Sequence, residues 1–192
     1  MVKISLVMGL AAFTSLSLAQ PIEQEEGTVT SSFSFEEWAN GISADPEGNH
    51  LSPDEAVASA IEFGTESSSH EKRAGNIVCN TAGVKVAKAD SCLAPFRDKK
   101  APSAAACIDK IARRGGQTCH SKTITTFCSN SGAEIVGATT GPKFDVKTTC
   151  QKVAATAGKV MDICFRSDNT VQGVNFLNGK GGRMAVNISG KK

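Results

Sequence analysis

All seven cysteines of this 192-residue chain lie within residues 79–164, and none precedes the basic pair Lys72-Arg73. This grouping constrains the fold more than any other feature, because cysteines in an oxidising compartment form disulfides before they form metal sites. Seven cysteines allow at most three bridges within the chain and leave one free or paired between chains. The disulfide candidates are Cys79, Cys92, Cys107, Cys119, Cys128, Cys150 and Cys164.

Residues 1–19 have the pattern of a secretory signal peptide. Lys3 supplies the positive charge, residues 4–13 form the apolar stretch, and Ser17 and Ala19 are the small residues before a cut ahead of Gln20. A membrane anchor is the alternative, but this run is shorter than the roughly 20 residues needed to cross a bilayer. The sequence therefore predicts a secreted, extracellular protein.

Residues 20–73 form an acidic segment with twelve acids and a net charge of −10. Within it, Ser52-Pro53-Asp54-Glu55 is a capping box that predicts a helix over 53–63, ended by Gly64. Lys72-Arg73 follows a serine-rich run and matches the motif that Golgi convertases cut. The chain has other dibasic pairs, at 99–100, 113–114 and 191–192, but only Lys72-Arg73 lies between an acidic segment without cysteine and a basic segment that contains every cysteine. We therefore predict a pro-segment over 20–73, with an uncut, solvated pair as the alternative.

Residues 74–192, the predicted mature domain, carry eighteen lysines and arginines against seven acids, a net charge of +11. Such a charge suits an anionic partner, although charge alone names none. The domain has five phenylalanines and neither tyrosine nor tryptophan. Because single-strand nucleic-acid platforms stack their ligands on exposed aromatic rings, this composition disfavours nucleic acid as a partner.

Periodicity and turn residues predict an α+β sandwich with two helices on one face of an antiparallel sheet. Ser103 begins one helix, which stops at Gly115-Gly116, and Asp145 begins the second, which stops at Gly158. Turns are expected at 129–132 and 178–182. Strands are expected over 76–80, 122–129, 133–140, 160–166, 170–176 and 183–189.

The apolar stripes of the two helices carry Cys107 and Cys150, so a bridge between these two is the first choice. Cys119 and Cys128 are nine residues apart along one extended run, which spans up to about 30 Å. A disulfide needs Cα atoms within about 7 Å. These two should not pair with each other unless the chain turns between them.

The spacing of the later cysteines resembles a known family. Nine residues separate Cys119 from Cys128, fourteen separate Cys150 from Cys164, Gly116-Gln117-Thr118 precedes the first pair, and a glycine-rich turn leads into the strand 183–188. Over about residues 104–188 the chain resembles the small killer toxins of smut fungi (killer protein 4) and their fungal relatives. The resemblance implies two antiparallel helices on an antiparallel sheet and a bridge matching Cys107–Cys150. It also implies a basic toxin that perturbs calcium uptake and has no enzyme activity.

The chain departs from that family in its cysteines and in one lysine. The partners that the family pattern would supply for Cys119 and Cys128 are missing, and its functional lysine has no matching motif here. Either Cys79 or Cys92 is then expected to pair with Cys164. The resemblance therefore supports a shared fold more strongly than it supports a shared activity, which in the toxin would be the blocking of a channel for calcium uptake.

A small secreted ribonuclease is the strongest enzyme alternative. Its chemistry needs two acid–base groups near one phosphate, and the mature domain offers only His120 and Glu134. A hairpin about Asn130 would place them roughly 20 Å apart, so we expect His120 to be an ordinary surface residue. No nucleophile elbow, metal-ligand cluster or phosphate loop is present in the sequence, and we predict no catalytic residue, metal or cofactor.

We therefore expect a fungal effector-like or killer toxin-like protein, with a role in virulence or competition, that binds a host or competitor cell-surface or membrane protein. The candidate contact residues are Arg113, Arg114 and Lys122. Asn187 begins a glycosylation sequon, and strand alternation would turn it outward; an unmodified surface asparagine is the alternative. An inert wall-associated structural protein is a third possibility.

Overall fold

The computed structural model describes residues 32–64, 77–79, 87–88, 103–140, 144–166 and 169–190. The predicted signal peptide, the Lys72-Arg73 pair and Cys92 lie outside these residues. Among the described residues, no helix has the length and apolar character needed to cross a membrane.

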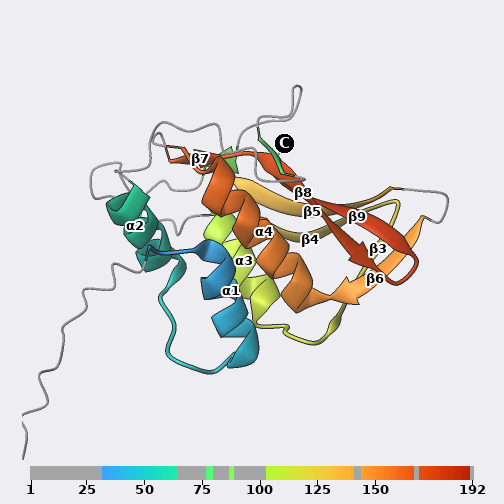
Figure 1. Ribbon diagram of the computed structural model, residues 1–192, viewed down its shortest axis with the longest axis horizontal. Helices are drawn as coiled ribbons and strands as arrows, with labels where there is room; N and C mark the ends of the chain where they lie inside the picture. Colours follow the sequence, from blue (N-terminus) through green and yellow to red (C-terminus); the bar gives the residue numbers. More distant parts are fainter. Residues whose placement is uncertain are drawn as a thin grey trace, which may run out of the picture. The chain divides into compact units, whose positions relative to one another are not determined.

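The main sheet has five antiparallel strands in the order β1-β8-β9-β5-β4 (Figure 1). Alternate residues of the central strand β9 turn Met184, Val186 and Ile188 into the core, where all three are fully buried. The predicted glycine-rich turn connects β8 to β9. The strands are β1 (Val78–Cys79), β4 (Ile124–Asn130), β5 (Ala133–Thr140), β8 (Gly173–Gly179) and β9 (Gly182–Ser189).

Helices α3 (Ser103–Ala112) and α4 (Cys150–Cys164) lie side by side on one face of this sheet, and α1 (Phe35–Ala44) packs against these two helices (Figure 1). The backbone N–H groups of Cys150 and Gln151 donate to carbonyls just after α3, so the end of α3 meets the start of α4 and the two helices are antiparallel. The predicted disulfide-stapled α+β fold is confirmed.

Two small antiparallel ribbons lie outside the main sheet. One joins β3 (Thr118–Lys122) to β6 (Asp145–Thr149), and the other joins β2 (Ala87–Lys88) to β7 (Thr170–Val171). Thr123 has a positive φ of 59° and separates β3 from β4, so the run from Cys119 to Cys128, which we expected to be extended throughout, forms two strands.

The predicted boundaries of α4 were wrong at both ends. Asp145 does not cap the helix, because residues 145–149 pair with β3; Thr149 is the cap, and its Oγ1 accepts from the Lys152 N–H at 3.3 Å. The helix also continues through Gly158 to Cys164 and replaces the strand predicted over 160–166. Packing of α1 against this helix outweighs the modest cost of an interior glycine.

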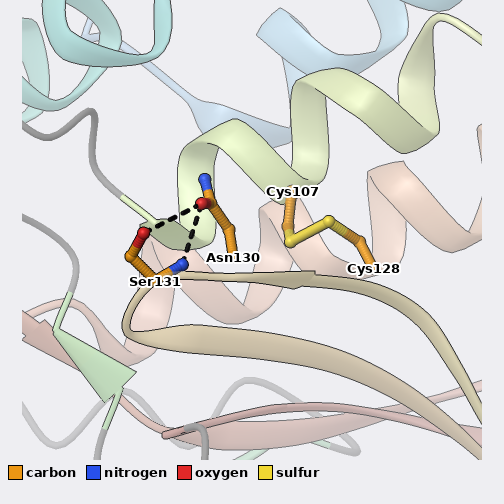
Figure 2. Close-up of a disulfide and its surroundings, with 4 residues drawn as sticks. All are labelled: Cys107, Cys128, Asn130 and Ser131. Atoms are coloured by element: carbon orange, nitrogen blue, oxygen red, sulfur yellow. Dashed lines mark hydrogen bonds between the residues drawn. A yellow bond between two sulfur atoms is a disulfide. The ribbon is translucent and has the colours of Figure 1, made fainter.

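The expected Cys107–Cys150 bridge was wrong. Cys107 on α3 instead bonds to Cys128 on β4 (Figure 2), with Cα atoms 5.5 Å apart. Cys150, the first residue of α4, bonds to Cys119 on β3 at a Cα distance of 4.9 Å. The reason is that the buried side of α3 contacts β4 and β5, whereas the start of α4 lies beside β3.

The third disulfide joins Cys79 on β1 to Cys164 at the end of α4, with Cα atoms 5.4 Å apart. Of the two partners left open for Cys164, the structure thus selects Cys79. As expected, Cys119 and Cys128 do not pair with each other.

Part of the acidic segment is also folded. The predicted helix after the capping box is α2 (Pro53–Gly64), where the Ser52 N–H donates to Glu55 Oε2 at 2.8 Å and the Glu55 N–H donates to Ser52 Oγ at 3.3 Å. The bonds from Ser52 hold the pKa of Glu55 below its ordinary value. Helix α1, which the sequence did not predict, buries Phe35 and Ile42 in the core.

Candidate functional site

The outer face of the β3–β6 ribbon gathers charged side chains. The two strands pair His120 with Lys147 and Lys122 with Asp145. Because side chains alternate along a strand and directly opposite residues share a face, all four lie on one side. Three of them are exposed and His120 is half-buried.

The inner face of the same ribbon is anchored in the core. Cys119, Ser121 and Val146 are buried there. Cys119 is held by its disulfide, and the Ser121 hydroxyl donates to the Gly137 carbonyl at 2.8 Å. These contacts fix the orientation of the outer face.

The turn between β8 and β9 adds a third backbone to the ribbon. Lys147 and Lys180 exchange two backbone hydrogen bonds, of 2.9 and 2.8 Å. Gly181 makes this approach possible: its φ is +102°, and a Cβ at this position would collide with the Asp145 carbonyl. As a result, His120, Lys147 and Lys180 form one row across three neighbouring backbones.

We call His120, Lys122, Lys147 and Lys180 the basic row. Lys147 and Lys180 are directly opposite each other, where Cβ atoms lie about 4.5–5.5 Å apart, so their like charges repel. None of the three lysines forms a salt bridge within the described part of the chain. The arrangement presents several cations at short, fixed intervals to solvent, which is suited to an anionic group.

Asp145 is the carboxylate of this face. Its Oδ1 lies 2.6 Å from His120 Nε2, and the two side chains are 53% and 31% exposed. The bond to His120 holds the pKa of Asp145 below its ordinary value, and the positive charges of Lys147 and Lys122 add to this effect. Asp145 therefore stays ionised at neutral pH and orients the imidazole.

The three predicted contact residues do not form one site. Lys122 belongs to the basic row. Arg113 directly follows α3, and its guanidinium pairs with Asp109 at 3.0 Å and donates to the Pro46 carbonyl. Arg114 is half-buried in the turn that follows α3. Their role in contact with a partner stays a prediction.

Sequence reasoning missed Lys147, Lys180 and the His120–Asp145 pair. The available signal was the alternation of Asp145, Val146 and Lys147, in which one apolar residue stands between two charged ones, but Asp145 was assigned to a helix cap. His120 is not the isolated surface residue that we expected, since it has a carboxylate partner.

The remaining predicted sites fall elsewhere. Glu134, on β5, accepts a hydrogen bond from Ser189 Oγ at 3.3 Å. Asn187 lies in the central strand β9, half-buried, and its amide oxygen is buried without a hydrogen-bond partner among the described residues. The strand does not turn this side chain fully outward, and glycosylation of Asn187 stays a prediction. The described residues contain no cluster of three metal-ligating side chains.

Comparison with known proteins finds one family model, a domain of unknown function (DUF8794), which matches residues 75–190. The chain belongs to the DUF8794 family. No curated protein and no solved structure matches it.

The DUF8794 match begins two residues after Arg73. It includes all three disulfides and the whole basic row, whereas α1 and α2 lie outside it. The family match therefore starts where the composition of the chain changes.

Proposed function

We propose that this DUF8794 protein is a secreted toxin-like or effector-like protein that acts by binding an anionic group on a host or competitor cell. The basic row is the observation that carries the proposal. The fold keeps the like charges of Lys147 and Lys180 directly opposite each other at a cost in stability, and a bound anion would offset that repulsion.

The disulfides agree with such a role. Three bridges among the described residues indicate an oxidising compartment, the setting of secreted proteins. The Cys119–Cys150 bridge also fastens the ribbon to the start of α4, so that little backbone order has to be acquired on binding. The resemblance to fungal killer toxins adds calcium uptake as the cellular process to examine.

The partner that fits this face is a cell-surface or membrane protein with a cluster of acidic side chains. Lysine ammonium groups are compact charges that attract carboxylates without imposing a planar geometry. Binding should weaken with salt, because exposed charges are screened over about 8 Å at physiological ionic strength.

Binding of the labelled protein to fungal and plant cells tests the proposal. We expect Lys147→Gln with Lys180→Gln to weaken binding about tenfold. The matched control, Lys110→Gln with Lys152→Gln, removes the same charge from exposed residues of α3 and α4 and should bind nearly as the wild type does.

Equal weakening by both variants would show that only net charge matters, and no binding of the wild type to any cell would overturn the proposal. Binding without effect on growth would favour the wall-associated structural role. If growth is inhibited, rescue by added calcium would support an action on calcium uptake.

One observation favours the ribonuclease alternative. His120 is oriented by Asp145 and surrounded by lysines, as a base acting on a phosphodiester would be. General acid–base cleavage needs a second titrating group, and Glu134 bonds to Ser189 on β9 instead. We therefore expect no cleavage when the purified protein is incubated with RNA. Cleavage that is lost in His120→Ala would reverse this assignment.

A further inference from the structure

Helix α1, which belongs to the acidic segment, packs its apolar face against the DUF8794 domain. Phe35, Trp38, Ala39 and Ile42 follow the spacing of one helical face, and all are buried. The ring of Phe35 packs 6.3 Å from that of Phe165, just past α4. This face of α1 is part of the core of the folded protein.

A side chain of α4 caps the start of α1. Both carboxylate oxygens of Asp162 are used: Oδ1 accepts from the Phe35 N–H at 2.6 Å, and Oδ2 accepts from Ser34 Oγ at 2.9 Å and from the Glu36 N–H at 3.1 Å. A carboxylate here also faces the positive end of the helix dipole. Desolvation in this contact raises the pKa of Asp162, and the hydrogen bonds oppose that rise.

Gly158 brings the two helices into close approach. A Cβ on this residue would lie 2.6 Å from the Phe35 carbonyl oxygen and 2.7 Å from the Glu36 nitrogen. Both atoms belong to the backbone and cannot rotate away. Beside this contact, Lys159 forms a salt bridge with Glu36 at 3.0 Å.

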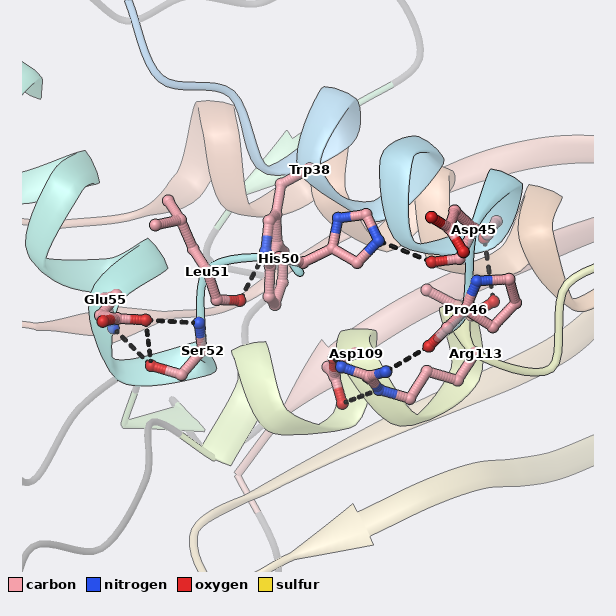
Figure 3. A network of polar contacts seen from close by, with 11 residues as sticks. Trp38, Asp45, Pro46, His50, Leu51, Ser52, Glu55, Asp109 and Arg113 are labelled. Atoms are coloured by element: carbon pink, nitrogen blue, oxygen red, sulfur yellow. Dashed lines mark hydrogen bonds and ion pairs between the residues drawn. The ribbon is translucent and has the colours of Figure 1, made fainter. Parts of the chain in front are cut away.

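The other end of the segment is fastened to α3. Ser43 Oγ donates to the Ala112 carbonyl at 3.0 Å. Figure 3 shows the Arg113 guanidinium between Asp109 and the Pro46 carbonyl, so it ties α3 to the loop after α1. In the same view the Trp38 indole donates to the Leu51 carbonyl at 3.0 Å, which holds that loop to α1.

We propose that residues 32–64 stay bound to the α3–α4 face after the chain is cut between α2 and β1, so that the finished protein consists of two chains. Release would expose the apolar stripe of α1 and the surface beneath it to water. The acidic segment has no cysteine, so it would be held by non-covalent contacts alone.

This assembly changes the charge of the finished protein. Residues 74–192 alone carry +11, but with the −10 of residues 20–73 the net charge is +1. In the two-chain form the basic row is then a local concentration of positive charge on a nearly neutral protein. The retained segment would make binding more selective for clustered anionic groups and less dependent on overall charge.

The test replaces part of the linker between Gly64 and Ile77 with the recognition site of a specific protease and cuts the purified, oxidised full chain. Trp38 is the single tryptophan of the chain, and its burial in the α1 contact makes its fluorescence a reporter of binding. We expect the two fragments to elute together under native conditions, with unchanged Trp38 emission, and to separate on a non-reducing denaturing gel.

Elution of the DUF8794 domain alone, with a red shift of Trp38 emission, would overturn the proposal.

Two variants test the surface itself. Asp162→Ala removes the cap and Gly158→Val blocks the close approach, and each should raise the dissociation constant of the cut fragments about tenfold or more. Gln151→Ala, at an exposed position of α4, is the control and should leave the constant unchanged.

A variant that does not fold is recognised by circular dichroism of the uncut chain. In that case Ser34→Ala replaces it in the comparison; this variant removes one of the three hydrogen bonds to Asp162 and the bond that Ser34 Oγ accepts from the Glu37 N–H. Equal dissociation constants for Ser34→Ala, the control and the wild type would contradict the role of the cap.

Discussion

The hydrogen bond between His120 and Asp145 joins two residues that are 25 positions apart in the chain. Its effect is electrostatic, because it keeps the carboxylate of Asp145 ionised to lower pH than usual. A group whose pKa is lowered by folding adds stability above its unfolded pKa and loses that contribution as the pH falls through the folded value. The acid limb of the stability profile should therefore depend on His120.

Replacement of His120 by alanine should raise the pKa of Asp145 towards its ordinary value. The bond from His120 is the largest cause of the lowered pKa, whereas Lys122 acts only through its charge. NMR titration of the Asp145 carboxyl carbon measures the change. Lys122→Ala serves as the comparison and should cause a smaller rise, and an unchanged pKa in His120→Ala would exclude the bond in solution.

In helix α4, the local sequence indicates that a helix forms, whereas tertiary contacts determine where it begins and ends. Its apolar stripe was visible in the sequence, but its start was placed at Asp145 and its end at Gly158. Residues 145–149 form a strand instead, because they pair with β3. At the other end, the close approach of α1 explains a glycine that would otherwise be expected to stop the helix.

Thr149→Ala should lower the free energy of unfolding by about 1 kcal/mol, because it removes the side chain that caps α4. Urea denaturation followed by circular dichroism measures this loss. The exposed neighbour replaced in Gln151→Ala carries no cap and should change stability little. A loss of the same size in both variants would mean that the cap contributes nothing.

At the scale of the whole fold, the three disulfides of the described residues each connect a helix to a strand rather than two helices. The Cys79–Cys164 bridge spans 85 residues and fastens β1 to the end of α4, whereas the Cys107–Cys128 bridge spans 21. A bridge over a longer loop restricts the unfolded chain more. The longest bridge should therefore contribute most to stability.

Replacement of Cys79 and Cys164 by alanine should destabilise the protein by about 1 kcal/mol more than the same replacement of Cys107 and Cys128, by the logarithm of loop length. Thermal or urea unfolding of the two double variants, with the remaining bridges oxidised, measures the difference. A greater loss for the shorter bridge would show that packing in the α3–β4 contact outweighs loop entropy.

The sequence by itself determined the fold class, the capping box of α2, helix α3 and the turn between β8 and β9, because caps, periodicity and glycine turns act over a few neighbouring residues. Only the tertiary structure decided which cysteines pair, since the sequence favoured Cys150 as the partner of Cys107, whereas the packing of α3 against β4 selects Cys128. The tertiary structure also decided that part of the acidic segment belongs to the core and that residues of β3, β6 and the β8–β9 turn form one basic row. These outcomes depend on contacts between residues distant in sequence, which no local pattern records.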